Sequence, residues 1–436
     1  MNSHKMLKLV AVFLFASKIS SLAAFWSSYS IQKSKFHPPF STSLSSSSSS
    51  SLSPVTTISA DVSVLSSESS LYKRRVRYSG KYPKRFEEKY KESRGDEEVL
   101  ERVKAKGGTP AGTHRSIMLE ECLERLGLKE KREEKEEEGS SSGWVAVDCT
   151  LGFGGHSSAI LDLILPFNGS TLVAIDQDSL EIEKTKKRLM EKHAESNISE
   201  KTFQVVQSNF RDIGTVLNEK GLVGKVDCIL ADLGYSSMQI DNPERGFSHK
   251  FDGPLDMRMN CNQSIPTAAD YLQNVTEKQL AKALKENSDE LLAEELARHI
   301  VRQRPSRTSI LAKCVRDVYS KWAEKEKRKL EKGDIDTALA RTMQAIRIEV
   351  NDEFGALSAL LSAIPSVLKP GGKVVFLTFH SGEDRRVKKA FKSGWKELGV
   401  YSSWSRDVVR AGAEERKNNP RSKCAKLRWA VRSESE

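Results

Sequence analysis

The chain has 436 residues, of which 38% are hydrophobic and 30% charged, with 70 Lys and Arg against 59 Asp and Glu. This length gives room for two domains, or for one domain with a large insertion. No apolar stretch reaches the roughly 20 residues that cross a bilayer, so a polytopic membrane protein is excluded and no membrane partner is expected. The six cysteines form no Cys-x-x-Cys pair. We therefore expect no metal site and no disulfides, and six reduced, buried thiols.

The first 60 residues have the composition of a targeting segment. They contain no Asp, Glu or Arg, but five Lys and nineteen Ser. A Ser-rich, acid-poor leader is typical of an organellar transit peptide. A mitochondrial leader is usually rich in arginine, and the first arginine here is Arg74, so we expect a chloroplast (plastid) protein, with the mitochondrion as the alternative. The apolar run from Leu9 to Ala16 keeps a secretory signal open. Residues 61–112 are expected to be a linker.

A predicted strand, turn and helix follow a short predicted helix over 116–126. Residues 144–147 form an apolar strand that ends in Asp148, and a helix is expected over 157–165. Such a turn lets a ligand approach bare backbone at a helix N-terminus. Ser157 breaks the dinucleotide fingerprint, and a carboxylate at Asp148 suits the amino group of S-adenosylmethionine better than a pyrophosphate. We therefore favour S-adenosylmethionine over NAD. The turn holds four candidate cofactor-binding residues, Gly152, Gly154, Gly155 and His156.

Three more predicted strands end in candidate site residues. Strand 171–175 ends in Asp176, which can accept hydrogen bonds from both ribose hydroxyls or, alternatively, cap a helix. Phe210 follows strand 203–206 and either packs on an adenine ring or belongs to the core. Strand 226–231 ends in Asp232. Alternating strands and helices predict an α/β fold with a doubly wound parallel sheet, a Rossmann-like class I methyltransferase sheet, with all these residues at one rim.

The segment Asp232-Leu-Gly-Tyr235 has the outline of the Asp-Pro-Pro-Tyr segment of enzymes that methylate amino groups of nucleic-acid bases, without its prolines. An exocyclic amine is a poor nucleophile because its lone pair is delocalised into the ring. A carboxylate that accepts a hydrogen bond from its N–H favours the nucleophilic geometry, and methyl transfer then depends mainly on positioning. The alternative is that Asp232 only contacts the cofactor.

Longer blocks carry a specific resemblance. Residues 232–241, 244–259, 344–353, 379–385 and 419–428 resemble the bacterial 16S ribosomal RNA (cytosine-N4)-methyltransferases, and the similarity covers about 113–432. The resemblance implies a cytidine of small-subunit rRNA near the decoding site as the methyl acceptor. It also implies that S-adenosylmethionine is contacted by Gly154, Gly155, His156, Asp176, Phe210, Asp232 and Gln239.

The resemblance also implies a helical insertion, which gives five segments: transit peptide 1–60, linker 61–112, methyltransferase core 113–241, helical insertion 242–345 for substrate recognition, and core 346–432 with a basic C-terminus. The insertion shows a helix opening at Thr276 and an apolar stripe through Leu291, Leu292, Leu296 and Ile300 that is expected in the core. Three arginines of the insertion, Arg302, Arg304 and Arg307, and Arg347 just after it are candidates for phosphate contacts.

The C-terminal part is the most basic, with 16 basic against 8 acidic residues over 370–436, as expected of a surface that binds phosphate backbones or of a solvated face. A turn at 370–372 precedes strand 373–379, which ends in His380, either a residue that orients the base or a structural histidine. We expect Asp232, Tyr235 and His380 to be catalytic. The predicted partner is small-subunit rRNA or an assembling small ribosomal subunit, and the oligomeric state stays open. Two alternatives remain: an amino methyltransferase acting on another RNA or on DNA, and a cofactor-binding rRNA assembly factor.

Overall fold

The computed structural model describes residues 116–130, 143–196, 198–261 and 264–434, which all belong to one compact unit of the chain, Val76–Glu436. The predicted transit peptide and linker lie outside the described residues, as does most of the charged loop between residues 129 and 143. Within the described ranges, no helix combines the length and the apolar character that a membrane span requires.

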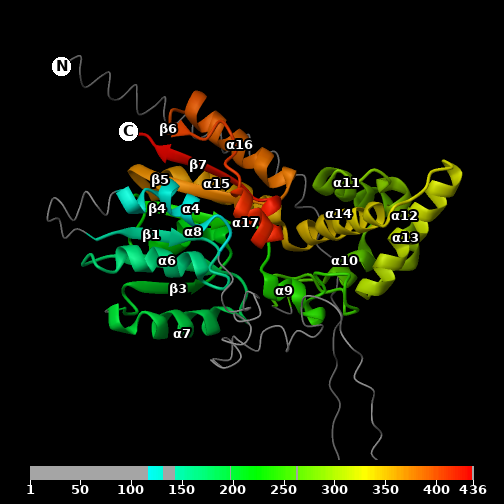
Figure 1. The fold of residues 1–436 in the computed structure, drawn as a ribbon, viewed down its shortest axis with the longest axis horizontal. Helices are drawn as coiled ribbons and strands as arrows, with labels where there is room; N and C mark the ends of the chain where they lie inside the picture. The colour runs from blue at the N-terminus through cyan, green and yellow to red at the C-terminus, as the bar shows by residue number, and fades with distance from the viewer. Residues whose placement is uncertain (1–115, 131–142, 197, 262–263, 435–436) are drawn as a thin grey trace, which may run out of the picture. The chain divides into compact units, whose positions relative to one another are not determined.

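A seven-stranded sheet forms the centre of the fold, in the order β3-β2-β1-β4-β5-β7-β6 (Figure 1). Strands β1 to β5 run parallel, whereas β7 is antiparallel to both β5 and β6. The predicted α/β, Rossmann-like methyltransferase sheet is confirmed, with an antiparallel pair added at one edge. The strands are β1 (Val145–Asp148), β2 (Thr171–Asp176), β3 (Phe203–Gln207), β4 (Val226–Asp232), β5 (Leu368–Thr378), β6 (Tyr401–Trp404) and β7 (Lys426–Arg432).

Helices cover both faces of this sheet. Strand β4 is buried along almost its whole length, as parallel strands between two helical layers must be. One core packs α4 and α6 on the sheet, and a second core packs α8, α15 and α16 on it. The helices of the sheet domain are α4 (Leu119–Leu126), α6 (Gly155–Ile164), α7 (Ile182–Lys192), α8 (Ile213–Glu219), α9 (Ser237–Asp241), α15 (Glu353–Val367), α16 (Ser381–Lys396) and α17 (Ala413–Asn418).

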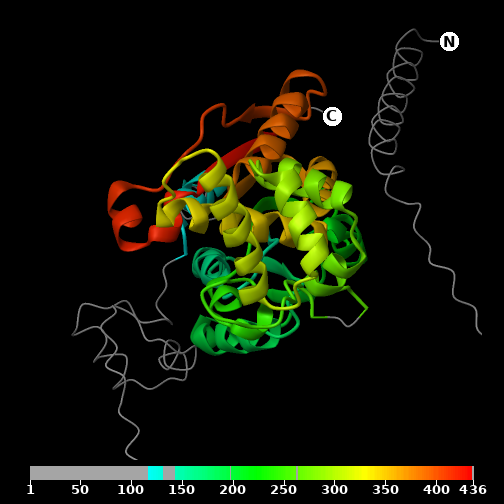
Figure 2. The ribbon, with the colours of Figure 1, turned by 90° about the vertical axis from the view of Figure 1, so that its right-hand side faces the viewer.

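Five helices between β4 and β5 form the insertion, and Figure 2 shows them from their own side. They enclose a separate hydrophobic core. Helix α14 continues past residue 345 to Asn351, Asp352 has a left-handed φ of 45°, and α15 then returns the chain to the sheet. As predicted, Thr276 caps α11, accepting a hydrogen bond from the backbone N–H of Gln279. The insertion helices are α10 (Ala268–Asn274), α11 (Glu277–Ser288), α12 (Ala293–Gln303), α13 (Thr308–Lys325) and α14 (Lys332–Asn351).

Three expectations about local structure are wrong. Leu291 does not join the core: its side chain is 76% exposed, because α12 begins only at Ala293 and Leu291 lies in the preceding turn. The predicted turn at 370–372 is a bulge inside β5, where Gly371 has a φ of 70°. Cys424 is exposed rather than buried, while the other five cysteines are buried or half-buried, and all six are free thiols.

Most of the insertion arginines are held by the protein. Arg304 donates hydrogen bonds to the carbonyl oxygens of Leu272 and Val275, and Arg307 pairs with Asp252 at 2.8 Å. Arg347 is buried, so the expectation that it could meet a phosphate is wrong. Its position at the end of α14 turns its guanidinium toward the sheet domain. Arg302 alone of the four is exposed without such a contact among the described residues.

Candidate functional site

The turn between β1 and α6 is built on glycines with left-handed backbone. Gly152 and Gly154 have φ values of 47° and 72°, a region that residues with a Cβ rarely adopt. A Cβ on Gly154 would lie 2.8 Å from side-chain carbons of both Thr185 and Leu189, and one on Gly155 would lie 2.0 Å from the Ser116 hydroxyl. The turn therefore presents bare backbone at the start of α6, as the sequence predicts.

The carboxylates at the ends of β1 and β2 organise this turn. Asp148 is buried, and its two oxygens accept hydrogen bonds from the backbone N–H of Thr150 (3.0 Å) and from the Ser157 hydroxyl (2.6 Å). Asp176 accepts hydrogen bonds from the backbone N–H of Gly152 (2.7 Å) and of Asp178 (2.9 Å).

Burial raises the pKa of Asp176 although both backbone hydrogen bonds favour its ionised form. The alternative that Asp176 caps the following helix is wrong, because α7 begins at Ile182 and its N-cap is Glu181.

Asp232 ends β4 with one oxygen unsatisfied. Its Oδ2 lies 3.5 Å from Nδ1 of the buried His156, whereas its Oδ1 is buried and has no hydrogen-bond partner within the described chain. Burial raises the pKa of Asp232 to about 6, although His156 lowers it. Nε2 of His156 lies 3.1 Å from the carbonyl oxygen of Ile117 and therefore carries hydrogen, because a carbonyl can only accept. The Asp232–His156 contact is thus favourable only when one further proton lies between the two groups.

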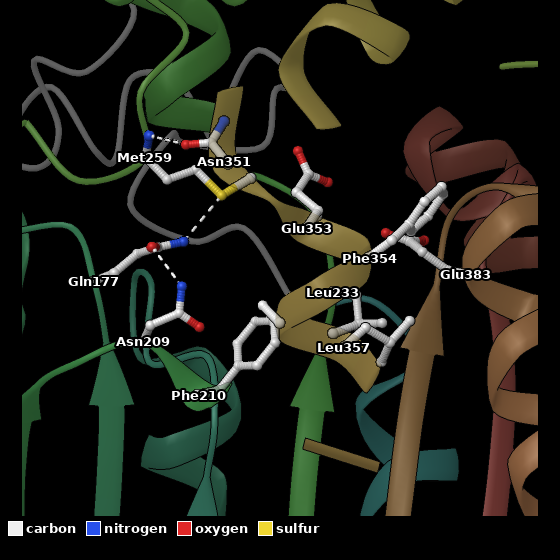
Figure 3. Close-up of a pocket in the computed structure, with 12 residues that line it drawn as sticks. Gln177, Asn209, Phe210, Leu233, Met259, Asn351, Glu353, Phe354, Leu357 and Glu383 are labelled. Carbon is white, nitrogen blue, oxygen red and sulfur yellow. Dashed lines mark hydrogen bonds between the residues drawn. The ribbon is translucent and has the colours of Figure 1, made fainter. Parts of the chain in front are cut away.

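A pocket of about 380 Å³ opens beside these strand ends (Figure 3). Phe210, which follows β3, lines the pocket, and the side-chain amide of Asn209 donates a hydrogen bond to Gln177 at 3.1 Å. Contact of Phe210 with an adenine ring stays a prediction. The opposite wall comes from the end of α14 and the start of α15. Its lining combines apolar side chains with a few amides and carboxylates, as sites for small organic molecules do. Its lining residues are Gln177, Asn209, Phe210, Leu233, Gly234, Met259, Asn351, Glu353, Phe354, Ala356, Leu357 and Glu383.

Two predicted site residues face other parts of the protein. Gln239 is buried, donating a hydrogen bond to Asp178 at 2.7 Å and accepting one from the backbone N–H of Ser236 at 2.9 Å, so its predicted cofactor contact stays a prediction. The ring of Tyr235 stacks on Phe247 with centroids 5.5 Å apart, and the Arg347 guanidinium lies 4.2 Å from its centroid. Tyr235 therefore contacts Arg347, whose ion-pair partner is the pocket residue Glu353.

A polar cluster that the sequence did not predict lies where α14, α15 and α16 meet. Arg347 donates two hydrogen bonds to Glu353, at 2.7 and 3.0 Å. Glu383 accepts hydrogen bonds from the backbone N–H groups of Phe379 and His380. Burial alone would raise the pKa of the Glu383 carboxyl, but His380, the N–H of Phe379 and Arg347 hold it below its usual value.

His380 is the unsatisfied member of this cluster. Its Nε2 lies 3.1 Å from a carboxylate oxygen of Glu383, and its buried Nδ1 has no hydrogen-bond partner among the described residues. The arrangement of Glu353, His380 and Glu383 has the spacing of metal ligands. Arg347, however, already supplies the positive charge opposite Glu353. The donor set therefore fits an organic ligand with hydrogen-bonding groups better than a cation.

These features fit S-adenosylmethionine. The bare backbone turn, Asp176 and Phe210 would hold its amino-acid, ribose and adenine parts, and the unpartnered oxygen of Asp232 lies near the rim they share. Sequence reasoning missed Glu353 and Glu383, which line the pocket. Both lie in blocks that carry the family resemblance, but their neighbours in the sequence do not reveal that two separate helices bring them together.

Comparisons with known proteins identify the family. Residues 111–433 match the model of the MraW methylase family. A ribosomal RNA small subunit methyltransferase H 1 from Agathobacter rectalis is 45% identical over 84% of this chain and 100% of its own length, and one from Lachnoclostridium phytofermentans is 41% identical over 83% and 94%. An rRNA methylase structure from Streptococcus thermophilus covers 67% of this chain and 87% of its own, at 8% identity and a TM-score of 0.28. The chain belongs to the MraW methylase family and is a methyltransferase whose cofactor is S-adenosylmethionine.

Proposed function

We propose that this methyltransferase modifies the exocyclic N4 amine of a cytidine in small-subunit ribosomal RNA, and that it does so in a chloroplast. The relatives that span most of the chain carry the name ribosomal RNA small subunit methyltransferase, which supports the substrate class. The amine as acceptor is supported by Asp232, whose position after β4 matches the sequence pattern of amino-methylating enzymes.

The single observation that carries the proposal is the buried, unpartnered Oδ1 of Asp232. A buried carboxylate oxygen without a donor is costly, and an amine N–H would satisfy it. The cofactor supplies an electrophilic methyl group on a positively charged sulfur. Asp232 would accept a hydrogen bond from the amine, which draws the lone pair out of conjugation with the ring. The proton that the amine releases can be held between Asp232 and His156, which are 3.5 Å apart.

Two residues next to the pocket, His380 and Tyr235, would position the base. His380 offers its Nδ1, which has no hydrogen-bond partner among the described residues, while the ionised Glu383 favours a hydrogen on Nε2, 3.1 Å away. A base in this site must be unstacked, because side chains cannot reach an amine inside an A-form helix. Tyr235, fixed between Phe247 and Arg347, would limit the depth to which such a base enters.

The test is nucleoside mass spectrometry on a small-subunit rRNA transcript incubated with the full chain and S-adenosylmethionine. We expect N4-methylcytidine with the wild type and at least 100-fold less with Asp232→Asn, since one positioned acid–base group contributes about 10²–10⁴-fold. Asp227→Asn is the matched control, because Asp227 is a buried carboxylate at the opposite end of the same strand. Methylation of another base or atom, or an unchanged rate in Asp232→Asn, would contradict the proposal.

The compartment is proposed from the leader alone, whose 60 residues contain no acidic residue and no arginine. A fusion of residues 1–75 to a fluorescent protein should accumulate in chloroplasts of plant cells, whereas a fusion of residues 76–436 should not. If the first fusion accumulates in mitochondria or is secreted, the leader is a targeting signal for that compartment and not for the chloroplast.

A further inference from the structure

From residue 385 onward, one face of α16 carries only basic residues. Taking about 100° of rotation per residue, its five outward-facing basic residues fall within an arc of about 100°. The residues on the opposite side, Val387 and Phe391, are fully buried against the sheet. We call these five exposed residues the α16 stripe: Arg385, Lys388, Lys389, Lys392 and Lys396.

The charges of the α16 stripe are not neutralised by the protein. Within the described residues, its four lysines have no carboxylate partner, and only Arg385 pairs, with Asp289 at 3.5 Å. The two acids in the first turn of α16 face inward, where Glu383 contacts His380 and Asp384 pairs with Arg428 at 2.6 Å.

Helix α7, at the other edge of the sheet (Figure 1), shows the contrasting case. It carries four lysines, and all four are paired with nearby carboxylates. Unpaired lysines are therefore not a general feature of the helices on this protein's surface. The pairs are Lys184 with Glu181 (3.2 Å), Lys186 with Glu200 (2.9 Å), Lys187 with Glu191 (3.8 Å) and Lys192 with Asp162 (3.5 Å).

An exposed aromatic side chain adjoins the α16 stripe. Trp395 is 39% exposed, and the guanidinium of Arg406 lies 5.3 Å from its ring centroid. Surfaces that bind single-stranded nucleic acid commonly combine positive charge with exposed aromatic rings. An amphipathic helix lying on a membrane would need an open apolar face instead, and the apolar face of α16 is buried in the core.

We propose that the α16 stripe binds the phosphate backbone of the RNA strand next to the methylated nucleotide. This inference rests on the proposed function. Helix α16 begins directly after His380 at the rim of the site, and at about 1.5 Å per residue Lys396 lies roughly 24 Å further along the helix axis. The stripe thus leads from the pocket outward, and an RNA strand lying on it would place one nucleotide at the rim.

The experiment measures affinity of the full chain for a fluorescent small-subunit rRNA fragment as a function of KCl concentration. The variant Lys388→Gln/Lys392→Gln/Lys396→Gln should bind more weakly, and the slope of log K against log [KCl] should become less negative by about 2–3, at 0.7–0.9 per lost phosphate contact. The control Lys184→Gln/Lys186→Gln/Lys187→Gln removes the same charge from α7 and should leave the slope unchanged.

An unchanged slope in the α16 variant, or an equal change in the α7 control, would overturn the inference. So would a wild-type chain that ignores RNA but binds an acidic protein or anionic vesicles through these lysines. Calorimetric affinity for S-adenosylmethionine should be the same in all three proteins. Nucleoside mass spectrometry separates the two proposals: if the slope changes as expected while no N4-methylcytidine forms, the α16 surface stands and the proposed reaction fails.

Discussion

Replacing Asp232 by Asn should stabilise the protein without cofactor at high pH. In the folded chain the pKa of Asp232 is raised from 3.8 to about 6 by burial, so the folded state holds this proton more tightly than the unfolded state does. Stability is then greatest below the unfolded pKa and falls as pH rises through about 6. A shift of about 2 units corresponds to about 3 kcal/mol of lost stability above that pH. Asparagine has no charge to bury and loses nothing over the same range.

Urea unfolding measured from pH 4 to pH 8 tests this reasoning. Because about a quarter of the Asp232 side chain is exposed, we expect the Asn variant to exceed the wild type by about 1–3 kcal/mol at pH 8, and the difference to vanish near pH 4. The control Asp227→Asn should instead lower stability at pH 8, because Asp227 pairs with Lys369 and accepts the backbone N–H of Val145. If the wild type is more stable than Asp232→Asn at pH 8, or if the difference does not vary with pH, burial of the ionised Asp232 does not destabilise the protein as argued.

Three further predictions concern the turn, the pocket and the polar cluster. Gly154→Ala should lower stability by about 1–3 kcal/mol and weaken cofactor binding in calorimetry, whereas Gly169→Ala, also at positive φ but with open space around it, isolates the backbone cost. Phe210→Ala should weaken S-adenosylmethionine binding by about 0.5–1.5 kcal/mol; equal affinity would mean that the ring only packs in the core. Arg347→Met should cost about 2–4 kcal/mol in urea unfolding by leaving the largely buried Glu353 unpaired. Adding Glu353→Gln should restore most of this stability; no restoration would show that loss of the pair is not the cause.

The positions of the strand-end residues could be predicted because parallel strands end at one edge of a sheet. Asp148, Asp176, Phe210 and Asp232 all follow such strands, and the structure brings them to that edge. Their hydrogen bonds could not be predicted. Both oxygens of Asp148 accept hydrogen bonds, from Thr150 and Ser157, whereas one oxygen of Asp232 has no partner among the described residues. This difference depends on side chains from other turns.

The polar cluster was beyond sequence reasoning for a different reason. Arg347 and Glu383 lie on helices separated by a buried strand, and only the packing of α14 against the sheet domain brings them close. A helical pattern places Arg347 on a polar face, which is compatible with solvent, a phosphate or a buried partner alike. Leu291 shows the opposite error: it was expected in the core and is exposed. The spacing of apolar residues does not reveal that the helix begins only two residues later, at Ala293.

The junction between α14 and α15 joins the insertion to the sheet domain at the wall of the pocket. Asn351 lies on one side of Asp352, and Glu353 and Phe354 lie on the other; all three line the pocket. The last turn of the insertion therefore forms part of the pocket wall. Exchanging the insertion for that of a relative would therefore alter the pocket unless this short junction were kept. In a chimera, the boundary between the two sequences should lie before Arg347 rather than at the end of α14.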